Sequence, residues 1–294
     1  EGEYILKSQD DGDRFSTGET SLVIDFPDAQ PKLLVQNRRE ELDSPPFQGS
    51  KTNIGLDLAT NTISLSGTGL IDDITDFDLV SSLDDLGGVS ATGTYLFNES
   101  LDLGAVFSLD LRKHIQTFSV YSTDTIDSVL DIDARLDFDG TGSTDTNAEV
   151  FVQVSQDGTN YSGFQKFANG TFKGRTFKFK CVLSTKDTNQ DIRVSQLGYI
   201  AEFQRRTEQS AAAITSSGNT QVNFTDPFFT GTSALLGANS NLPSIGITAF
   251  NMQSGDFYEV TNRTSNGFQI HFKNSSNASV SREFTFSAIG FGKG

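Results

Sequence analysis

Apolar and polar residues alternate along most of this chain. The clearest runs are Val150, Val152 and Val154; Phe177, Phe179, Cys181 and Leu183; Phe268, Ile270 and Phe272; and Phe284, Phe286 and Ala288. Successive side chains of a β-strand point to opposite faces, so a period of two predicts strands with one buried face. Clusters of Gly, Asn, Asp, Ser and Thr separate these runs at spacings of roughly 8–15 residues, which is typical of antiparallel sandwiches and barrels. The sequence therefore predicts an all-β fold.

Helical periodicity is nearly absent. Residues 211–214, Ala-Ala-Ala-Ile, are expected to make one helical turn, and residues 77–88 a short helix or an irregular loop. With 25 phenylalanines and no tryptophan, the core is expected to consist largely of Phe, which has no polar atom to satisfy.

A chain of 294 residues is long enough for two domains of about 100–200 residues each. Residues 1–206 carry 18 Lys or Arg and 33 Asp or Glu, whereas residues 207–294 carry four and five. This shift in charge coincides with a polar, small-residue-rich stretch at 203–220, which reads as a linker. We therefore expect two antiparallel, jelly-roll-like β-sandwich domains in tandem, at 1–206 and 207–294, with the break near Arg206.

Composition excludes several classes of protein. A net charge of −16 argues against a nucleic-acid binder, which needs a basic face. There is no apolar run of about 18 residues, so no membrane span is expected. Cys181 is the only cysteine; it excludes an intrachain disulfide and is expected to be a buried, inert thiol. Because the first residue is Glu1 rather than Met, we expect a fragment or a processed product.

No catalytic or cofactor-binding residues are predicted. The two histidines, His114 and His271, each lie opposite the apolar face of a strand, which favours a surface or interface position over catalysis. The sequence has no Ser/His/Asp set, HExxH motif, Cys pair or phosphate-cradling glycine loop. We expect a protein that is not an enzyme.

One stretch of the sequence is rich in aspartate and raises the question of a metal site. Residues 131–150 hold Asp131, Asp133, Asp137, Asp139 and Asp145, of which the last three can converge on a calcium ion. The bidentate Glu of an EF-hand is missing, however, and the flanking runs are strands. A solvated acidic loop is favoured, so no metal ligand is predicted. Asp72-Asp73 and residues 82–88 pose a weaker version of the same question.

A sugar-binding surface would need exposed aromatic rings. Without tryptophan, the candidates with a polar tip are Tyr95, Tyr121, Tyr161 and Tyr258. Seven Asn-x-Ser/Thr sequons (Asn98, Asn160, Asn169, Asn223, Asn262, Asn274 and Asn277) receive no functional weight, because Asn, Ser and Thr are abundant throughout.

Four segments in order resemble the galactose-binding-like, or discoidin-like, jelly roll. They are "SLDLGAVFSLDLRKHIQTFSV" (100–120), "VQVSQDGTNYSGFQKF" (152–167), "RTFKFKCVL" (175–183) and "DIRVSQLGYIAEF" (191–203). Tyr161 stands where the family more often has Trp. Together with "DFDG" (137–140), these segments also look like a module of bacteriophage tail-tip and central-fibre proteins of the host-specificity type. The resemblance covers residues 100–203.

The segment 247–294 is similar to the terminal β-sandwich of many phage tail fibres, which resembles H-type lectins and is generally trimeric. Gly267-Phe268, Phe272 to Asn274, and Phe284 to Gly292 carry this resemblance, and Phe286 takes a position usually held by Trp. From the residues themselves, Asn266-Gly267 predicts a hairpin. The glycines of "AIGFGKG" (288–294) allow close approach of the backbone near an axis.

Two functions compete. The resemblance implies a virion component of a phage tail, a homotrimer that contacts other tail proteins and recognises a host receptor, either a glycan or an outer-membrane protein. The alternative is an extracellular carbohydrate-binding module of a secreted bacterial enzyme, monomeric and calcium-dependent. A hydrolase is a third class, for which no catalytic set is assembled.

Overall fold

The computed structural model describes residues 2–6, 20–24, 33–67, 88–121, 146–186, 188, 190–231 and 241–294. The described residues form antiparallel strands and a single 3₁₀ turn, η1 (Glu40–Leu42), so the prediction of an all-β fold is confirmed. In chain order the strands are β1 (Gly2–Leu6), β2 (Thr20–Ile24), β3 (Leu33–Arg39), β4 (Ser50–Thr52), β5 (Ile54–Asp57), β6 (Thr62–Leu65), β7 (Thr92–Leu96), β8 (Leu101–Tyr121), β9 (Thr146–Ser155), β10 (Gln165–Lys166), β11 (Gly170–Thr185), β12 (Gln190–Gln209), β13 (Ile214–Ser217), β14 (Asn219–Asn223), β15 (Ser244–Phe250), β16 (Phe257–Thr261), β17 (Gly267–Lys273) and β18 (Ser281–Phe291).

Two layers of strands enclose the first core. One layer contains β10, β9, β11, β7 and β4 in that order, and the other contains β8 and β12 with β3, β6 and β5. The long strand β8 belongs to both layers, because its first half pairs with β11 and its second half with β12. The N-terminal residues complete this sandwich through β3 to β6, whereas β1 and β2 pair only with each other among the described strands.

Aromatic rings fill the first core, as the sequence predicts. Phe179 lies at its centre: its ring stacks on Tyr199 at 4.5 Å and contacts Phe97 and Phe167 at 5.6 Å each, measured between centroids. Cys181 is fully buried in the same layer, as expected for an inert thiol, and burial raises its pKa to about 12. The alternation in β11 thus places phenylalanines inside and lysines outside.

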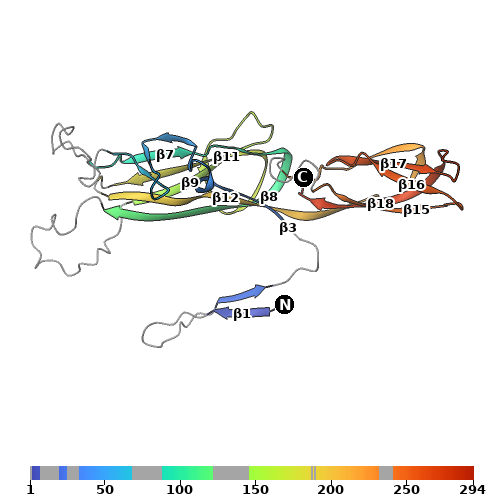
Figure 1. The fold of residues 1–294 in the computed structure, drawn as a ribbon, viewed down its shortest axis with the longest axis horizontal. Helices are drawn as coiled ribbons and strands as arrows, with labels where there is room; N and C mark the ends of the chain where they lie inside the picture. Colours follow the sequence, from blue (N-terminus) through green and yellow to red (C-terminus); the bar gives the residue numbers. More distant parts are fainter. Residues whose placement is uncertain are drawn as a thin grey trace, which may run out of the picture.

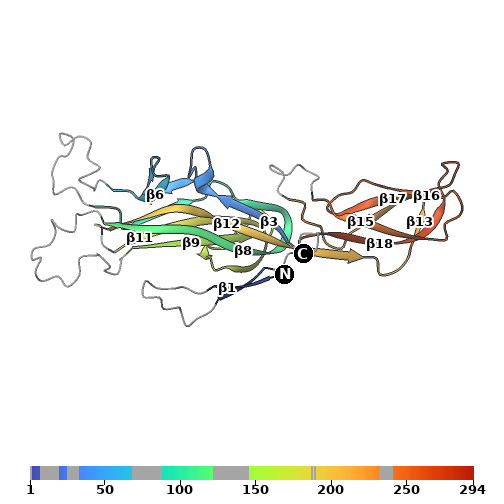
Figure 2. The same ribbon diagram turned by 60° about the horizontal axis from the view of Figure 1, so that its bottom comes forward.

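A second core lies between two smaller sheets. β18 pairs with β13, β15 and the end of β12, and opposite it β17 pairs with β14 and β16. β16 and β17 form the predicted hairpin, joined by residues 262–266. Figures 1 and 2 show the two groups of strands one after the other along the long axis, with β12 extending from the first into the second.

The stretch 203–220 is not the polar linker that its composition predicts. β12 continues to Gln209, and its last five residues pair with β18, so Arg206 lies within a strand. Residues 211–214 do not form a helical turn either, because Ile214 already begins β13. On either side of residues 211–213 the backbone pairs with β18: the Ser210 N–H donates to the Phe286 carbonyl, and Ile214 pairs with Phe284. The division into domains at 1–206 and 207–294 stays a prediction.

Candidate functional site

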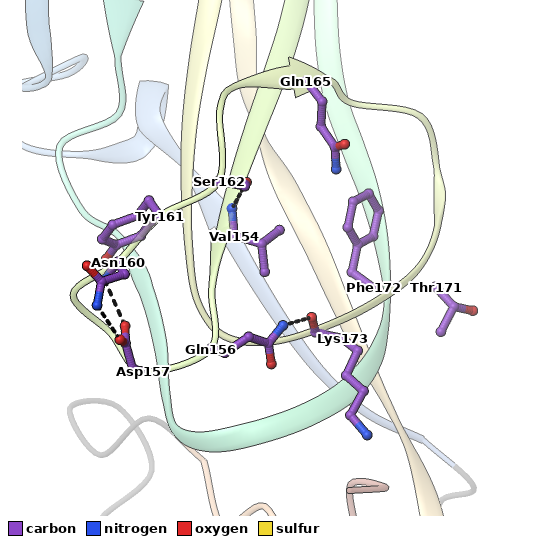
Figure 3. A pocket seen from close by; sticks show the side chains of 10 residues that line it. All are labelled: Val154, Gln156, Asp157, Asn160, Tyr161, Ser162, Gln165, Thr171, Phe172 and Lys173. Carbon is purple, nitrogen blue, oxygen red and sulfur yellow. Dashed lines mark hydrogen bonds between the residues drawn. The ribbon is translucent and has the colours of Figure 1, made fainter.

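The structure has a hollow of about 730 Å³ beside the turn that follows β9. The turn and β10 supply one side of the hollow, and the start of β11 supplies the other (Figure 3). Its lining residues are Val154, Gln156, Asp157, Asn160, Tyr161, Ser162, Gln165, Thr171, Phe172 and Lys173. Polar and apolar groups are therefore mixed on one concave surface, as in small-molecule sites.

The Asp157 carboxylate organises the turn. Its Oδ1 accepts hydrogen bonds from the backbone N–H groups of Asn160 (2.7 Å) and Thr159 (2.8 Å) and from the Ser155 hydroxyl (2.9 Å), and its Oδ2 accepts one from the Asn160 amide (2.6 Å). These donors favour the charged form and hold the pKa of Asp157 well below its usual value, with Asn160 the strongest contributor. Because its oxygens are occupied, Asp157 shapes the site rather than serving as a free acid.

Two further contacts fix the turn to the sheet. Gly158 has φ +86°, a conformation that glycine adopts without strain. The Arg175 guanidinium lies beside it, donating to the carbonyl of Asp157 at 3.1 Å and to the carboxylate of Asp102 at 3.2 Å. Opposite, the Gln156 side chain donates to the carbonyl of Lys173 at 2.8 Å. The rim of the hollow is thus built before any ligand arrives.

Aromatic rings form two walls. Figure 3 shows Tyr161 on one side and Phe172 on the other, with Val154 between them. Both rings are half-buried, and Phe172 packs edge-on against Phe167 of the core with ring centroids 5.7 Å apart. The ammonium of Lys178, from the outer face of β11, lies 4.2 Å from the centroid of Tyr161. This cation–π contact holds the ring in place.

The segment from Gly158 to Thr185 carries a charge opposite to that of the region as a whole. Between Gly158 and Thr185 there is no Asp or Glu, whereas Lys166, Lys173, Arg175, Lys178 and Lys180 all fall there. Lys166 pairs with Glu149 and Arg175 with Asp102. Within the described part of the chain, Lys173, Lys178 and Lys180 have no ion-pair partner. Three lysines of β11 therefore offer positive charge on a protein that is otherwise strongly acidic.

The tyrosines proposed as a platform have different surroundings. Tyr161 lines the hollow, and Tyr258 is 41% exposed at the start of β16. The prediction is wrong for Tyr95: its ring is fully buried, and its hydroxyl donates to Glu40 at 2.5 Å and accepts from the Gly49 N–H at 2.9 Å. Alternation assigns a strand residue to a face but does not say which face is covered. Tyr121 ends β8, and its side chain lies outside the described residues.

Both histidines have structural partners. His114 Nε2 and Gln196 Oε1 are 2.8 Å apart on neighbouring strands, and His271 Nε2 lies 2.6 Å from the Ser279 hydroxyl. The two imidazoles lie in different sheets. Each histidine thus links two adjacent backbone segments.

The acidic loop containing Asp131, Asp133, Asp137, Asp139 and Asp145 lies outside the described residues, as do Asp72-Asp73, residues 82–87 and most of the segment 77–88. Among the residues that are described, no group of three or more His, Cys, Asp or Glu side chains is placed to hold a metal ion. The described part also contains no helix that is long and apolar enough to cross a membrane.

Sequence reasoning did not single out the β11 side of the hollow. Phe172 and Lys173 come from the first part of β11, which pairs with β8, whereas the pairing with β9 begins at Thr176. Because β9 ends at Ser155, residues 171–173 extend past its end and lie beside the Asp157 turn. The signal present in the sequence was the acid-free, lysine-rich run itself. No family model, curated protein or solved structure matches this chain.

Proposed function

We propose that this chain is a structural, non-catalytic component of a phage tail, either tail tip or central fibre, that contributes to adhesion to the host cell. In this proposal the chain is a homotrimer in the virion, contacts other tail proteins, and displays its loops to a receptor on the host surface. The observation that carries the proposal is the packed connection between the two cores, because a continuous, packed connection suits a fibre that transmits force along its length.

Adjacent phenylalanines make this connection. Phe228 is buried in the second core, whereas Phe229 enters the first and stacks on Phe203 with ring centroids 3.8 Å apart. The Arg206 guanidinium lies 4.0 Å from the centroid of Phe228 and donates to the carbonyl of Asp226 at 2.8 Å. Phenylalanine rings thus join the two cores from both sides, and the Arg206 guanidinium packs on one of these rings.

The C-terminal strand reinforces the joint. The Gly292 N–H donates to the Gln204 carbonyl at 3.0 Å, and the Ser108 N–H donates to the Lys293 carbonyl at 2.7 Å. A Cβ on Gly290 would lie 2.5 Å from Phe228, and one on Gly292 would lie 2.8 Å from Phe229. The close backbone approach expected for this glycine-rich end therefore occurs against phenylalanines of the same chain.

The alternative, an extracellular carbohydrate-binding module, is favoured by one specific observation. The hollow pairs an ordered aromatic ring, Tyr161, with the side-chain amides of Gln156 and Gln165. Rings and amides in such an arrangement suit a sugar whether the module belongs to an enzyme or to a fibre. The two functions differ in oligomeric state and in metal dependence, and these properties decide between them.

Sedimentation equilibrium tests the proposal, performed with and without a calcium chelator. We expect a mass of three chains that chelator does not change. A monomer whose thermal unfolding midpoint falls on addition of chelator would contradict the fibre and favour the calcium-dependent module. Adsorption of the labelled protein to candidate bacterial cells provides the second measurement, with the heat-unfolded protein as its control.

A further inference from the structure

We infer that the hollow beside the Asp157 turn is a binding site for an acidic saccharide, with the sugar ring held between Tyr161 and Phe172 and its anionic group held by Lys173. This inference deepens the proposed function, on which it rests, by assigning the chemical class of the receptor. The ligand class is a sugar that carries an anionic group, either a carboxylate or a phosphate.

The walls of the hollow set the shape of the ligand. Tyr161 and Phe172 lie on opposite sides of the hollow with Val154 between them, and each ring has a neighbour that holds it, Lys178 and Phe167 respectively. Aromatic rings that are fixed before binding lose little conformational entropy when a ligand arrives. A ring-shaped ligand with an apolar face and polar edges matches such a slot.

The rim supplies groups for hydroxyls. Gln165, Thr171 and Asn160 are exposed along the edge of the hollow. The Thr171 hydroxyl donates to Asp110 and the Asn160 amide donates to Asp157, so these two residues offer oxygens as acceptors, whereas the Gln165 amide can donate and accept. Neutral groups of this kind recognise hydroxyls but do not distinguish a neutral sugar from an acidic one. That distinction needs a charge.

Lys173 provides this charge. It is exposed, lines the hollow, and has no acidic partner among the described residues. The Asp157 carboxylate in the lining stays charged, but its oxygens accept four hydrogen bonds from its own turn, and it forms no ion pair with Lys173. Lys178 adds a second positive charge behind Tyr161. Lys173 therefore offers an anion a positive charge that no carboxylate of the described residues pairs with, beside the carboxylates of Asp157 and Asp110.

Because salt screens distant charges, the charges next to the ligand dominate its binding. At physiological ionic strength charges farther apart than about 8 Å interact weakly, so the lysines beside the ligand outweigh distant carboxylates. Binding should accordingly weaken as salt is added. A site built only for a neutral sugar would show little salt dependence.

Isothermal titration of the full chain tests the inference, with trigalacturonate, galactose 6-phosphate and neutral galactotriose as ligands. We expect one or both acidic ligands to bind and galactotriose to bind at least about tenfold more weakly, since hydrogen bonds to charged groups are the stronger ones. Which acidic ligand binds more tightly identifies carboxylate or phosphate as the group recognised.

Three variants locate the site. Lys173→Gln should weaken acidic-ligand binding about tenfold or more and remove most of its salt dependence. Tyr161→Ala should weaken binding of every ligand. Lys180→Met is the matched control: it removes one positive charge from the same strand, but Lys180 covers Phe151 and Phe164 instead of lining the hollow. Far-ultraviolet circular dichroism verifies the fold of each variant.

Three results would overturn the inference: no binding of either acidic ligand at millimolar concentration, equal affinity for galactotriose, or unchanged affinity in a folded Lys173→Gln variant. Cell adsorption separates this failure from failure of the proposed function. If the protein is trimeric and adsorbs to cells but Lys173→Gln adsorbs equally, the function stands and the saccharide site is wrong. If purified protein binds the acidic sugar but is a monomer that adsorbs to no cell, the fibre is wrong and the site stands.

Discussion

The two cores differ in the kinds of side chain that they bury. The first buries charged side chains, Glu40, Glu41 and Asp191, among its apolar residues, whereas the described residues of the second bury only the hydroxyl of Ser216 among the polar groups. Each buried carboxylate is satisfied: Glu40 by Tyr95 and Arg38, Glu41 by Arg39 and the Leu197 N–H, and Asp191 by the N–H groups of Leu65 and Ile192. Buried, hydrogen-bonded carboxylates thus help to specify the first core, whereas ring packing dominates the second, where the Asp256 carboxylate pairs with Arg282 at the edge.

The difference has a local cause. Residues 38–43, Arg-Arg-Glu-Glu-Leu-Asp, form the corner between β3 and η1, and this corner is folded into the sandwich. At this corner the backbone leaves the hydrogen-bonded pairing of the sheet. Side chains must therefore supply hydrogen-bond partners for the polar groups that become buried there. Among the described residues, the second core contains no comparable buried corner, and packed phenylalanine rings fill it.

The largest expected effect comes from breaking the joint between the cores. Phe229→Ala removes a ring that is 1% exposed, and it should lower the free energy of unfolding by about 3–5 kcal/mol, as for other buried aromatic truncations. We expect guanidinium denaturation, followed by circular dichroism, to show one transition for the wild type and two for the variant, because the cores then unfold separately.

Phe250→Ala is the control for this experiment. Phe250 is 40% exposed at the end of β15, so its truncation should leave a single transition near the wild-type midpoint. A single transition for Phe229→Ala as well would mean that the shared strand β12 couples the cores without the phenylalanine.

An intermediate effect is expected in the polar corner of the first core. Tyr95→Phe removes the donor to the buried Glu40 carboxylate and should cost about 1–3 kcal/mol, the usual range for a buried polar group that loses a partner. The matched control is Tyr258→Phe in the second region, whose side chain is 41% exposed. Equal midpoints for the two variants in urea denaturation would contradict the view that buried polar contacts stabilise the first core.

The smallest effect is expected at the Asp157 turn and depends on pH. The turn lowers the folded-state pKa of Asp157, so its stabilising contribution is present above the unfolded pKa, about 3.9, and is lost as pH falls through the folded value. Asp157→Asn should therefore unfold at a lower temperature than the wild type at pH 7, and the gap should shrink at pH 3 and pH 2. A gap that does not change with pH would show that the turn depends on the shape of the side chain rather than on its charge.

Some expectations followed directly from local pattern. Strand positions, the phenylalanine cores, the buried Cys181 and the turn at Gln156 to Gly158 all depend on alternation and turn chemistry, which neighbouring residues encode. The expected linker failed for a related reason. Small polar residues are typical of linkers, but they also suit strands exposed on one face, and β13 and the end of β12 are such strands.

The candidate site was predictable on one side only. The sequence identifies Asp157, Gly158 and Tyr161 as a turn with an aromatic residue, because they are contiguous. Phe172 and Lys173 lie beside them because β11 extends past the end of β9 at Ser155, where it pairs with β8. Which strands lie side by side, and how far each extends past the other, depends on contacts between distant parts of the chain, and no local signal in a single sequence reports this.

The sequence by itself thus determined that this protein is built of antiparallel strands with phenylalanine inside and that its charge is concentrated before residue 207. The tertiary structure decided where each face is covered. It buried Tyr95, directed Phe228 and Phe229 into different cores, and brought the lysines of β11 beside the Asp157 turn. The physical reason is that alternation is a property of neighbouring residues, whereas burial depends on contacts between strands far apart in the chain.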